Sequence, residues 1–180
     1  YNPDKDEWGD PNSPRAAAGA AIPRFQLEDQ FGDTFDVYEF ASSGDPLFLD
    51  LTGLWCGWCH ELAKRMEGKP SALDGAAELE CLQTEIPAGN LDFSPIIYSD
   101  RTGEPGTGTR AAVDEWYNQH TNPHVPVLAD PDSEVYRWFQ AQGFPAVIRV
   151  DTETMTAVHA PGNPSYVASL GGACTELTSE

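Results

Sequence analysis

Residues 47–60 read Leu-Phe-Leu-Asp-Leu-Thr-Gly-Leu-Trp-Cys-Gly-Trp-Cys-His, and this run carries most of the structural information in the chain. Its first five residues form a nearly continuous apolar stretch, which is typical of a central strand buried on both faces. Only Asp50 interrupts that stretch. Cys56 and Cys59 follow where the pattern changes to helical spacing. The run therefore predicts a buried strand that leads into a helix with a Cys-x-x-Cys pair at its start.

This setting predicts that the cysteine pair is redox-active. At a helix N-terminus, unpaired backbone N–H groups and the helix dipole favour a thiolate over a thiol at Cys56. Cys59 lies one turn further on the same helix face, where we expect it to be less exposed and less acidic. Cys56 would then attack a partner disulfide, and Cys59 would attack the resulting mixed disulfide and release the partner.

Two other interpretations of the pair stay open, an inert disulfide and a metal-binding pair. Structural zinc needs a second pair of closely spaced ligands. The only candidates, His120 and His124, straddle Asn122-Pro123, which is poor helix sequence. We therefore predict no metal site and no cofactor.

Two further features point to the same chemistry. Asp50, within the apolar strand, should be desolvated, and a raised pKa would let it accept the proton of Cys59. The alternative is an Asp that faces solvent from an irregular strand end. Downstream, Pro145 directly precedes an Ala-Val-Ile strand. A cis bond between Phe144 and Pro145 would turn the chain toward the cysteines, although an ordinary trans proline fits the local sequence equally well.

Elsewhere in the chain, strand patterns alternate with helix patterns. A hairpin is expected from Phe25 to Tyr38, because two alternating apolar runs flank a Gly-containing turn. Further strands are expected at 93–98, 125–128, 146–150 and 156–159, and helices at 71–82, 113–120, 133–142 and from 163 onward. This order predicts an α/β fold, with a mixed central sheet and helices on both faces.

Residues 1–21 show no apolar periodicity and are predicted to form a flexible acidic tail or linker, followed by one folded domain over 22–180. The segment from Asn2 to Asp10 faintly resembles calcium-binding Asp repeats, but its spacing fails the EF-hand pattern. A flexible acidic tail is the favoured interpretation of this segment.

The composition limits the choice of partners. The 180 residues include 29 acidic and 10 basic side chains, for a formal charge of -19. Such a charge disfavours nucleic acid and anionic membranes as main partners, because their phosphates would be repelled. No apolar stretch approaches the roughly 20 residues that span a bilayer. Cys81 and Cys174 could form a second bridge in an oxidising compartment, or stay buried thiols in cytosol.

Taken in order, these features resemble the thioredoxin superfamily, and within it the AhpC/TSA–TlpA-like branch of extracytoplasmic thiol–disulfide oxidoreductases. The resemblance covers about residues 24–162. The matching segments are Phe25–Asp29 with Gly32, Leu47–Leu51, Trp55–Cys59, Val125–Asp130 and Gly143–Val147.

The resemblance implies a thioredoxin-like three-layer sandwich with an N-terminal hairpin. It also implies that Cys56 is the nucleophile, Cys59 the resolving thiol, Asp50 the buried acid and Pro145 a cis-proline. Phe144 and Pro145 would pair with an extended partner peptide. Trp55 and Trp58 would supply apolar contact around the exposed sulfur, and Gly57 between them is a further candidate substrate-binding residue.

The same resemblance implies protein substrates with thiols or disulfides, a redox partner, and a location outside the cytoplasm. The protein would be periplasmic, secreted or tethered to a membrane through its N-terminal tail. In the resembled fold the helix after Cys56 and the last helix share one face of the sheet. The resemblance therefore leads to the hypothesis that Cys81 and Cys174 form a bridge.

The chain also departs from the family pattern. Gly-Trp stands between the cysteines where many reductases carry Gly-Pro or Pro-Pro, which leaves the direction of electron flow open. His60 could tune the centre near neutral pH or be a plain helix residue. A thiol peroxidase is one alternative function, but peroxiredoxins carry Thr three residues before the reactive cysteine, whereas Thr52 lies four before Cys56. The other alternative is a non-enzymatic module that holds a soft ion such as Cu(I) or binds partners passively.

Overall fold

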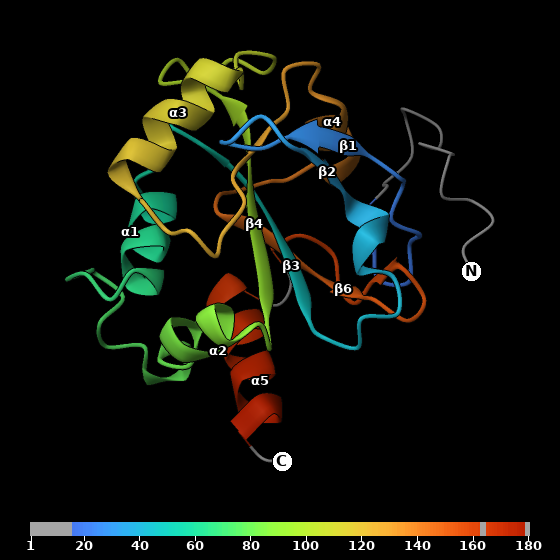
Figure 1. The fold of residues 1–180 in the computed structure, drawn as a ribbon, viewed down its shortest axis with the longest axis vertical. Coiled ribbons are helices and arrows are strands. Elements are labelled where there is room, and N and C mark those ends of the chain that lie inside the picture. Colours follow the sequence, from blue (N-terminus) through green and yellow to red (C-terminus); the bar gives the residue numbers. More distant parts are fainter. Residues whose placement is uncertain (1–15, 163–164, 179–180) are drawn as a thin grey trace.

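The computed structural model describes residues 16–162 and 165–178. Its centre is a five-stranded sheet in the order β5-β4-β3-β6-β7 (Figure 1). Strands β3, β4 and β5 are parallel, and β6 and β7 run antiparallel to their neighbours, so the predicted mixed sheet is confirmed. The strands are β3 (Leu47–Gly53), β4 (Asp92–Ser99), β5 (Leu128–Ala129), β6 (Ala146–Asp151) and β7 (Thr156–Ala157).

Helices cover both faces of this sheet (Figure 1). One face carries four α-helices, and the other carries α4, the 3-10 helix η1 and the N-terminal hairpin. The helices are α1 (Gly57–Met66), η2 (Ala77–Leu79), α2 (Leu82–Ala88), α3 (Arg110–Gln119) and α5 (Tyr166–Thr178) on the first face, with η1 (Val37–Phe40) and α4 (Glu134–Phe139) on the second. The hairpin is formed by β1 (Gln26–Glu28) and β2 (Thr34–Asp36), as the sequence predicts.

The central strand β3 is buried along its whole length. Its side chains alternate between the faces: Leu49 and Leu51 join the core beneath the hairpin and α4, whereas Phe48 packs with α1, α2 and α5. Asp50 has the same parity as Phe48, so it points to the face that carries the cysteine helix. The predicted strand, and the burial of its one carboxylate, are therefore confirmed.

The N-terminal segment differs from the prediction. Residues 16–21, predicted to belong to a flexible tail, pack along the edge of the sheet. The backbone N–H of Gly19 donates to the Ala157 carbonyl at 2.8 Å, and Ala157 and Ala20 form the next such bond. Ala16 is buried in the core of the second face. The rest of the predicted tail, with the segment that faintly resembles a calcium loop, lies outside the described residues.

The segment 71–82 also differs, because it is mostly turns instead of a helix. The backbone N–H groups of Asp74, Ala76 and Leu79 donate to carbonyls three residues back, on Ser71, Leu73 and Ala76. Bonds of this spacing form turns and 3-10 helix, and the next α-helix, α2, begins only at Leu82.

The start and end of α4 were predicted only in part. Ser133 stands at the N-cap position but makes no side-chain capping bond. The Asp130 carboxylate takes that role, accepting from the backbone N–H groups of Glu134, Val135 and Tyr136. The helix ends at Phe139, before the predicted stop at Gly143.

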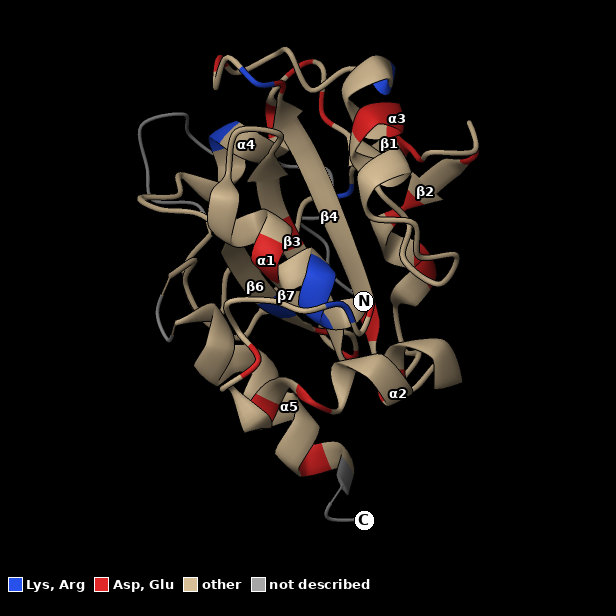
Figure 2. Cartoon of the chain, turned by 90° about the vertical axis from the view of Figure 1, so that its left-hand side faces the viewer, with Lys and Arg blue, Asp and Glu red and all other residues tan. Residues whose placement is uncertain are grey.

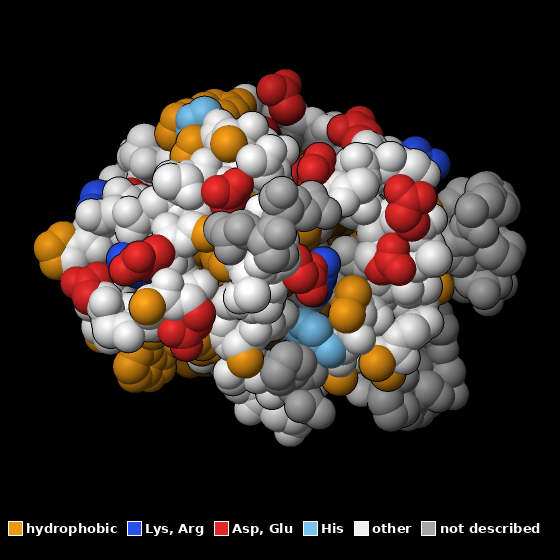
Figure 3. Space-filling view, turned by 90° about the horizontal axis from the view of Figure 1, so that it is seen from below, with side chains coloured by type: hydrophobic (Ala, Val, Ile, Leu, Met, Phe, Trp, Pro, Cys, Tyr) orange, Lys and Arg blue, Asp and Glu red, His pale blue; other side chains and the backbone are white. Residues whose placement is uncertain are grey.

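The charge of the chain is spread unevenly over its surface. Figure 2 shows acidic residues on many elements, whereas α1 carries the adjacent basic pair Lys64 and Arg65 in its last turn. On the face shown in Figure 3, Asp and Glu side chains are more frequent than Lys and Arg, and hydrophobic side chains lie in separate groups. None of the helices in the described part of the chain is long and apolar enough to cross a lipid bilayer.

Candidate redox site

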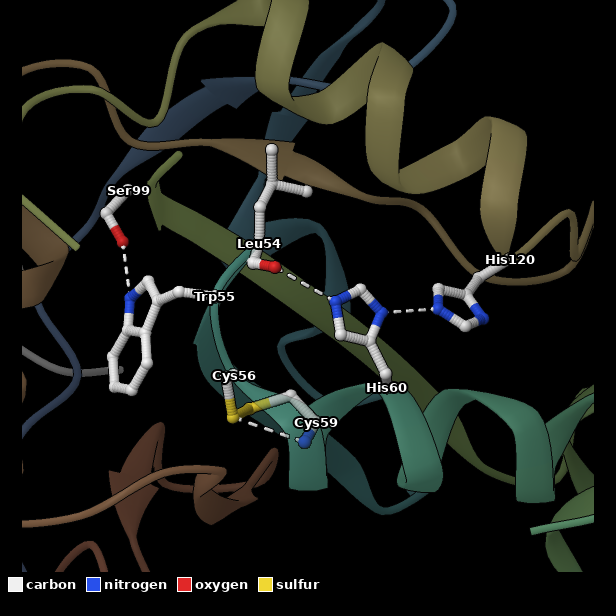
Figure 4. Close-up of a disulfide and its surroundings, with 7 residues drawn as sticks. All are labelled: Leu54, Trp55, Cys56, Cys59, His60, Ser99 and His120. Carbon is white, nitrogen blue, oxygen red and sulfur yellow. Dashed lines mark hydrogen bonds between the residues drawn. A yellow bond between two sulfur atoms is a disulfide. The ribbon is translucent and has the colours of Figure 1, made fainter. Parts of the chain in front are cut away.

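Cys56 and Cys59 form a disulfide at the N-terminus of α1 (Figure 4). The pair follows β3 after a short turn, and Cys56 is the N-cap residue of the helix. Its Sγ accepts a hydrogen bond from the Cys59 backbone N–H at 3.2 Å, and the two Cα atoms lie 5.3 Å apart. The predicted placement of the pair, at the end of a strand and the start of a helix, is confirmed.

Both cysteines are buried in this disulfide form. Cys56 is 3 % exposed and Cys59 1 %. The prediction of an exposed sulfur at Cys56 is therefore wrong for this form, because Cys56 packs into an apolar cluster with side chains such as Leu54 and Ala63. A partner must reach the sulfur through the residues around it.

Asp50 lies buried in β3 and does not face solvent. Asp50 is 2 % exposed, and burial raises the pKa of its carboxyl group well above the usual range. The backbone N–H of Ala146 opposes part of this shift, whereas Oδ1 finds no hydrogen-bond partner within the described part of the chain. Burial raises the pKa of Tyr166, the first residue of α5, and the charge of Asp50 adds to that shift. The alternative of a solvent-facing Asp is thus wrong.

The loop before β6 meets the loop before α1. The Phe144–Pro145 peptide bond is cis. Phe144 packs against the cluster that contains both cysteines, and its ring lies edge-on to Trp55 at 5.4 Å. Trp55 is anchored by a hydrogen bond from its indole N–H to the Ser99 hydroxyl at 2.9 Å (Figure 4). Gly53 makes room for this bond, since a Cβ there would come within 2.5 Å of the Ser99 Oγ.

Two tryptophans and a glycine surround the turn of the pair. Trp55 is 44 % exposed and Trp58 55 %, which is unusual for side chains of this size. Gly57 between them is also exposed, and a Cβ there would contact nothing within 4 Å. Together they form an open, largely apolar rim beside a buried disulfide.

The His60 ring points away from the disulfide (Figure 4). Its Nε2 lies 3.0 Å from the Leu54 carbonyl oxygen, and its Nδ1 lies 2.7 Å from Nε2 of His120. The ring also stacks on Trp116 with centroids 4.7 Å apart. His120 continues to Glu67, with Nδ1 3.2 Å from a carboxylate oxygen. The sequence gives no signal for this row of side chains, because its members come from separate segments.

The structure does not place His60 as a third ligand beside the two cysteines, as the metal-binding alternative requires. His60 engages both ring nitrogens with other partners and is turned away from the sulfurs. In the parts of the chain that the structure describes, no group of three or more His, Cys, Asp or Glu side chains is placed to hold a metal ion.

A groove runs beside the pair, between α1 and the end of α3. Its volume is about 660 Å³, and its lining includes Trp55, His60, Lys64, Arg101 and His120. The site therefore has an apolar rim and, next to it, a polar depression onto which the histidine row opens.

Cys81 and Cys174 form the second disulfide, so the hypothesis of a bridge between them is confirmed. Their Cα atoms are 5.6 Å apart although 93 positions separate them in the chain. The bridge joins the start of α2 to α5, on the same face of the sheet as α1. It lies apart from the Cys56–Cys59 cluster, in a different part of the core.

Fold and site together define a thioredoxin-like domain with a Cys-x-x-Cys disulfide at a helix N-terminus. Solved structures share this fold. DsbF of Mycobacterium tuberculosis superposes with a TM-score of 0.58 at 20 % identity, covering 85 % of this chain and 94 % of its own. The peroxidoxin BcpB of the same species gives a TM-score of 0.61 at 15 % identity, with 91 % and 97 % covered.

A third similar structure is the exposed lipoprotein thioredoxin Etrx1 of Streptococcus pneumoniae. Its TM-score is 0.57 at 18 % identity, with 85 % of this chain and 98 % of that chain covered. No family model matches the sequence, and no curated protein matches it either. The likeness to these structures therefore establishes the fold, and the chemistry has to be argued from the site.

Proposed function

We propose that this protein is a thiol–disulfide oxidoreductase that exchanges the Cys56–Cys59 disulfide with cysteines of partner proteins. One observation carries the proposal: the disulfide lies at the N-terminus of α1, directly against the loop of the cis Phe144–Pro145 bond. A purely structural bridge would not need two exposed tryptophans beside it. The fold shared with DsbF and Etrx1 supports the same conclusion.

The exchange proceeds in two balanced steps. In the reduced protein the Cys56 thiolate attacks one sulfur of a partner disulfide, forming a mixed disulfide and releasing the other partner sulfur as a thiolate. Cys59 then loses its proton, attacks the Cys56 sulfur and releases the second partner thiolate. Two electrons pass to the partner, and the Cys56–Cys59 disulfide is restored. Oxidation of a partner dithiol runs through the same steps in reverse.

Asp50 is the group that we assign to the proton of Cys59. It lies in β3, on the face of the sheet that carries α1, and burial raises the pKa of its carboxyl group, so it takes up a proton more readily than an ordinary Asp. The carboxyl and the thiol ionise in the same apolar surroundings, where two negative charges together are costly. Transfer from one to the other keeps the total charge constant.

The rim residues are assigned to the binding of partner proteins. Trp58 and Trp55 offer exposed aromatic area next to the sulfur, and the Phe144 ring packs edge-on against Trp55. Pro145 and its neighbours would offer backbone groups to an extended partner segment. The acidic surface favours neutral or basic partners over acidic ones.

A location outside the cytoplasm is part of the proposal. All four cysteines are paired in disulfides, which persist in oxidising compartments. Among the similar structures, Etrx1 is an exposed lipoprotein. Tethering through the N-terminal segment concerns residues outside the described part of the chain and stays a prediction.

The test is equilibration of the purified protein in dithiothreitol buffers of graded potential, followed by trapping of free thiols. We expect one reversible two-electron couple that is lost in Cys56→Ser. In Cys59→Ser the mixed disulfide between Cys56 and a disulfide-containing protein substrate should accumulate, because the thiol that would release the partner is missing. The double variant Cys81→Ala/Cys174→Ala serves as the control and should keep the couple. Absence of any couple assigned to Cys56 and Cys59 would refute the function.

The same preparation separates the peroxidase alternative. Thr52 is buried within β3, four residues before Cys56, and its hydroxyl finds no partner within the described residues. Turnover of hydrogen peroxide with added thiol should therefore be slow compared with disulfide exchange. Rapid peroxide turnover would instead assign the protein a function like that of the BcpB class.

A further inference from the structure

Three side chains next to the cysteine helix form a continuous row with the backbone. The row runs from the Leu54 carbonyl to His60, then to His120, and ends at the Glu67 carboxylate. The contacts are 3.0, 2.7 and 3.2 Å long, all within hydrogen-bonding distance. His60 follows Cys59 directly, and Leu54 lies two residues before Cys56. The row therefore spans the turn that presents the disulfide.

The protons in this row can be counted. The Leu54 carbonyl can only accept, so Nε2 of His60 must carry a hydrogen. An ionised Glu67 can also only accept, so Nδ1 of His120 must carry one. A neutral imidazole carries only one N–H, and in each ring that N–H is already used. With both rings neutral, His60 Nδ1 and His120 Nε2 would therefore face each other, 2.7 Å apart, with a lone pair on each nitrogen and no hydrogen between them. That contact needs one proton between the two nitrogens.

Two neutral imidazoles and an ionised carboxylate would together carry two titratable protons. The row needs one more proton than that. The count does not depend on where the proton lies. It can sit on the histidine pair, or on Glu67 with both rings donating toward Leu54. In each case the three side chains are neutral together, and loss of the proton leaves them with a charge of -1. Interacting groups of this kind titrate as a unit.

The surroundings make that charge matter. The side chains of His120 and Glu67 are 6 % and 5 % exposed. Burial lowers the pKa of His120, and the facing Glu67 opposes that shift. Lys69, which is half exposed, lies 2.8 Å from the other Glu67 oxygen. The stacked Trp116 ring, from α3, shields one side from water.

Solvent reaches the row from the groove, whose remaining charged groups are already paired. Lys64 and Glu61 of α1 form an ion pair at 2.6 Å, and Arg101 from the loop after β4 pairs with Glu115 of α3. His60 and His120 both line this groove, so a proton can be exchanged with water there.

We propose that His60, His120 and Glu67 are positioning residues for the Cys56–Cys59 centre, sharing one proton whose loss places a negative charge beside the pair and disfavours the Cys56 thiolate. This inference rests on the proposed oxidoreductase function. The sign follows from electrostatics: a nearby negative charge raises the pKa of a thiol. A less stable thiolate means a less stable reduced form, so the couple becomes more reducing as the row loses its proton.

Glu67→Gln is the matched variant, because it keeps the shape of the side chain. The new amide N–H can donate to Nδ1 of His120, and the row is then complete with two neutral rings. The surplus proton is no longer needed, and the row stays neutral when the pH rises. His124→Asn is the control, since His124 is exposed and outside the row. Thermal unfolding of each variant verifies that it is folded.

Two measurements test the proposal. In the oxidised protein, nitrogen NMR of the imidazoles should show His60 and His120 titrating together, with a strongly downfield shared proton, and this coupling should vanish in Glu67→Gln. In the reduced protein, ultraviolet absorbance should show Cys56 ionising in two steps. Glu67→Gln should give one step, with a Cys56 pKa below that of the wild type, and a several-fold larger thiolate fraction in alkaline buffer. His124→Asn should match the wild type.

The outcomes are separable. If the two rings titrate independently, the shared proton is refuted. If the rings are coupled but Glu67→Gln leaves the ionisation of Cys56 unchanged, the row is only structural and the positioning role is refuted. If the rings are coupled and Cys56 responds, but the pair exchanges with no disulfide at any potential, the oxidoreductase function fails while the proton count stands.

Discussion

Asp50 of the central strand lies opposite Val147 of β6 in the sheet, two residues after the cis Phe144–Pro145 bond, and the backbone N–H of Ala146 favours the ionised form of the Asp50 carboxyl group. Asp50 belongs to the central strand, whereas Ala146 begins the strand that carries the proposed substrate loop. The ionisation of one buried acid is therefore linked to the position of that loop. Removing the charge of Asp50 should affect both stability and catalysis.

Asp50→Asn should remove a pH-dependent loss of stability. Burial raises the pKa of Asp50 above that of the unfolded chain, so the native state binds the proton more tightly. The free energy of unfolding of the oxidised wild type should then fall, by up to about 1.4 kcal/mol per pH unit, as the pH rises from about 4 to the native pKa. Urea denaturation across this range should show that the slope is absent in Asp50→Asn.

The two proteins are compared by the slope of the free energy of unfolding against pH. Burying the new amide of the Asp50→Asn variant also changes that free energy, but by an amount that does not vary with pH. Equal slopes in the two proteins would mean that the carboxyl is ionised as easily in the native state as in the unfolded chain. The buried acid proposed here would then be ruled out.

Asp50→Asn should also slow the release of a partner from the mixed disulfide. The amide cannot accept the proton of Cys59, and general-base catalysis contributes on the order of 10²-fold. Attack by Cys56 on the partner should stay nearly unchanged. Rapid-mixing experiments with a disulfide-linked fluorescent peptide separate the two steps, and an equal slowing of both would contradict the assignment.

The first half of the site could be predicted because it is contiguous in sequence. Strand, turn, cysteine pair and helix start all lie within residues 47–60, and the apolar pattern identifies the strand directly. The cis state of Pro145 could not be predicted from local sequence, which fits both isomers. It required the resemblance to a known family.

Long-range side-chain contacts were missed for a different reason. His60 meets His120 only because α3 ends where it does, and no periodicity encodes that meeting. Asp130 was missed as a cap although it is local, because Ser133 occupies the expected position. The Asp carboxylate can accept several backbone N–H groups at once and therefore took the role.

Trp58→Ala should weaken reduction of protein substrates more than that of small disulfides. The ring is mostly exposed beside the sulfur, so its removal should cost little stability but much contact area with a partner. A central tryptophan at an interface is often worth about 2 kcal/mol, or roughly 30-fold in kcat/KM. Insulin reduction compared with a small aromatic disulfide measures this difference.

Phe31→Ala is the matched control for Trp58→Ala. Phe31 is also an exposed aromatic side chain, but it lies in the hairpin turn against Tyr117. Its removal should leave kcat/KM for insulin unchanged. Equal losses in the two variants would show that partners do not dock on the rim around the disulfide.

The Cys81–Cys174 disulfide should stabilise the fold without affecting the redox couple. It closes a loop of more than 90 residues, for which the chain-entropy model gives about 4 kcal/mol. Cys81→Ala/Cys174→Ala should therefore lower the free energy of unfolding by about that amount. Urea denaturation measures the loss, and thiol trapping should give the same Cys56–Cys59 potential as in the wild type. A shifted potential would mean that the two disulfides are coupled.

Gly171→Ala should destabilise the protein, whereas Gly172→Ala should not, although both residues lie inside α5. A Cβ at Gly171 would lie 2.7 Å from the Cβ of Glu78, and this close approach lets α5 pack against η2 beside the second disulfide. Separating the two elements should cost about 1–3 kcal/mol. At Gly172 a Cβ meets nothing within 4 Å, so the better helix propensity of Ala should stabilise by up to about 1 kcal/mol. Opposite signs in urea denaturation are the expected result, and two variants of equal stability would show that α5 does not rest on η2 at this glycine.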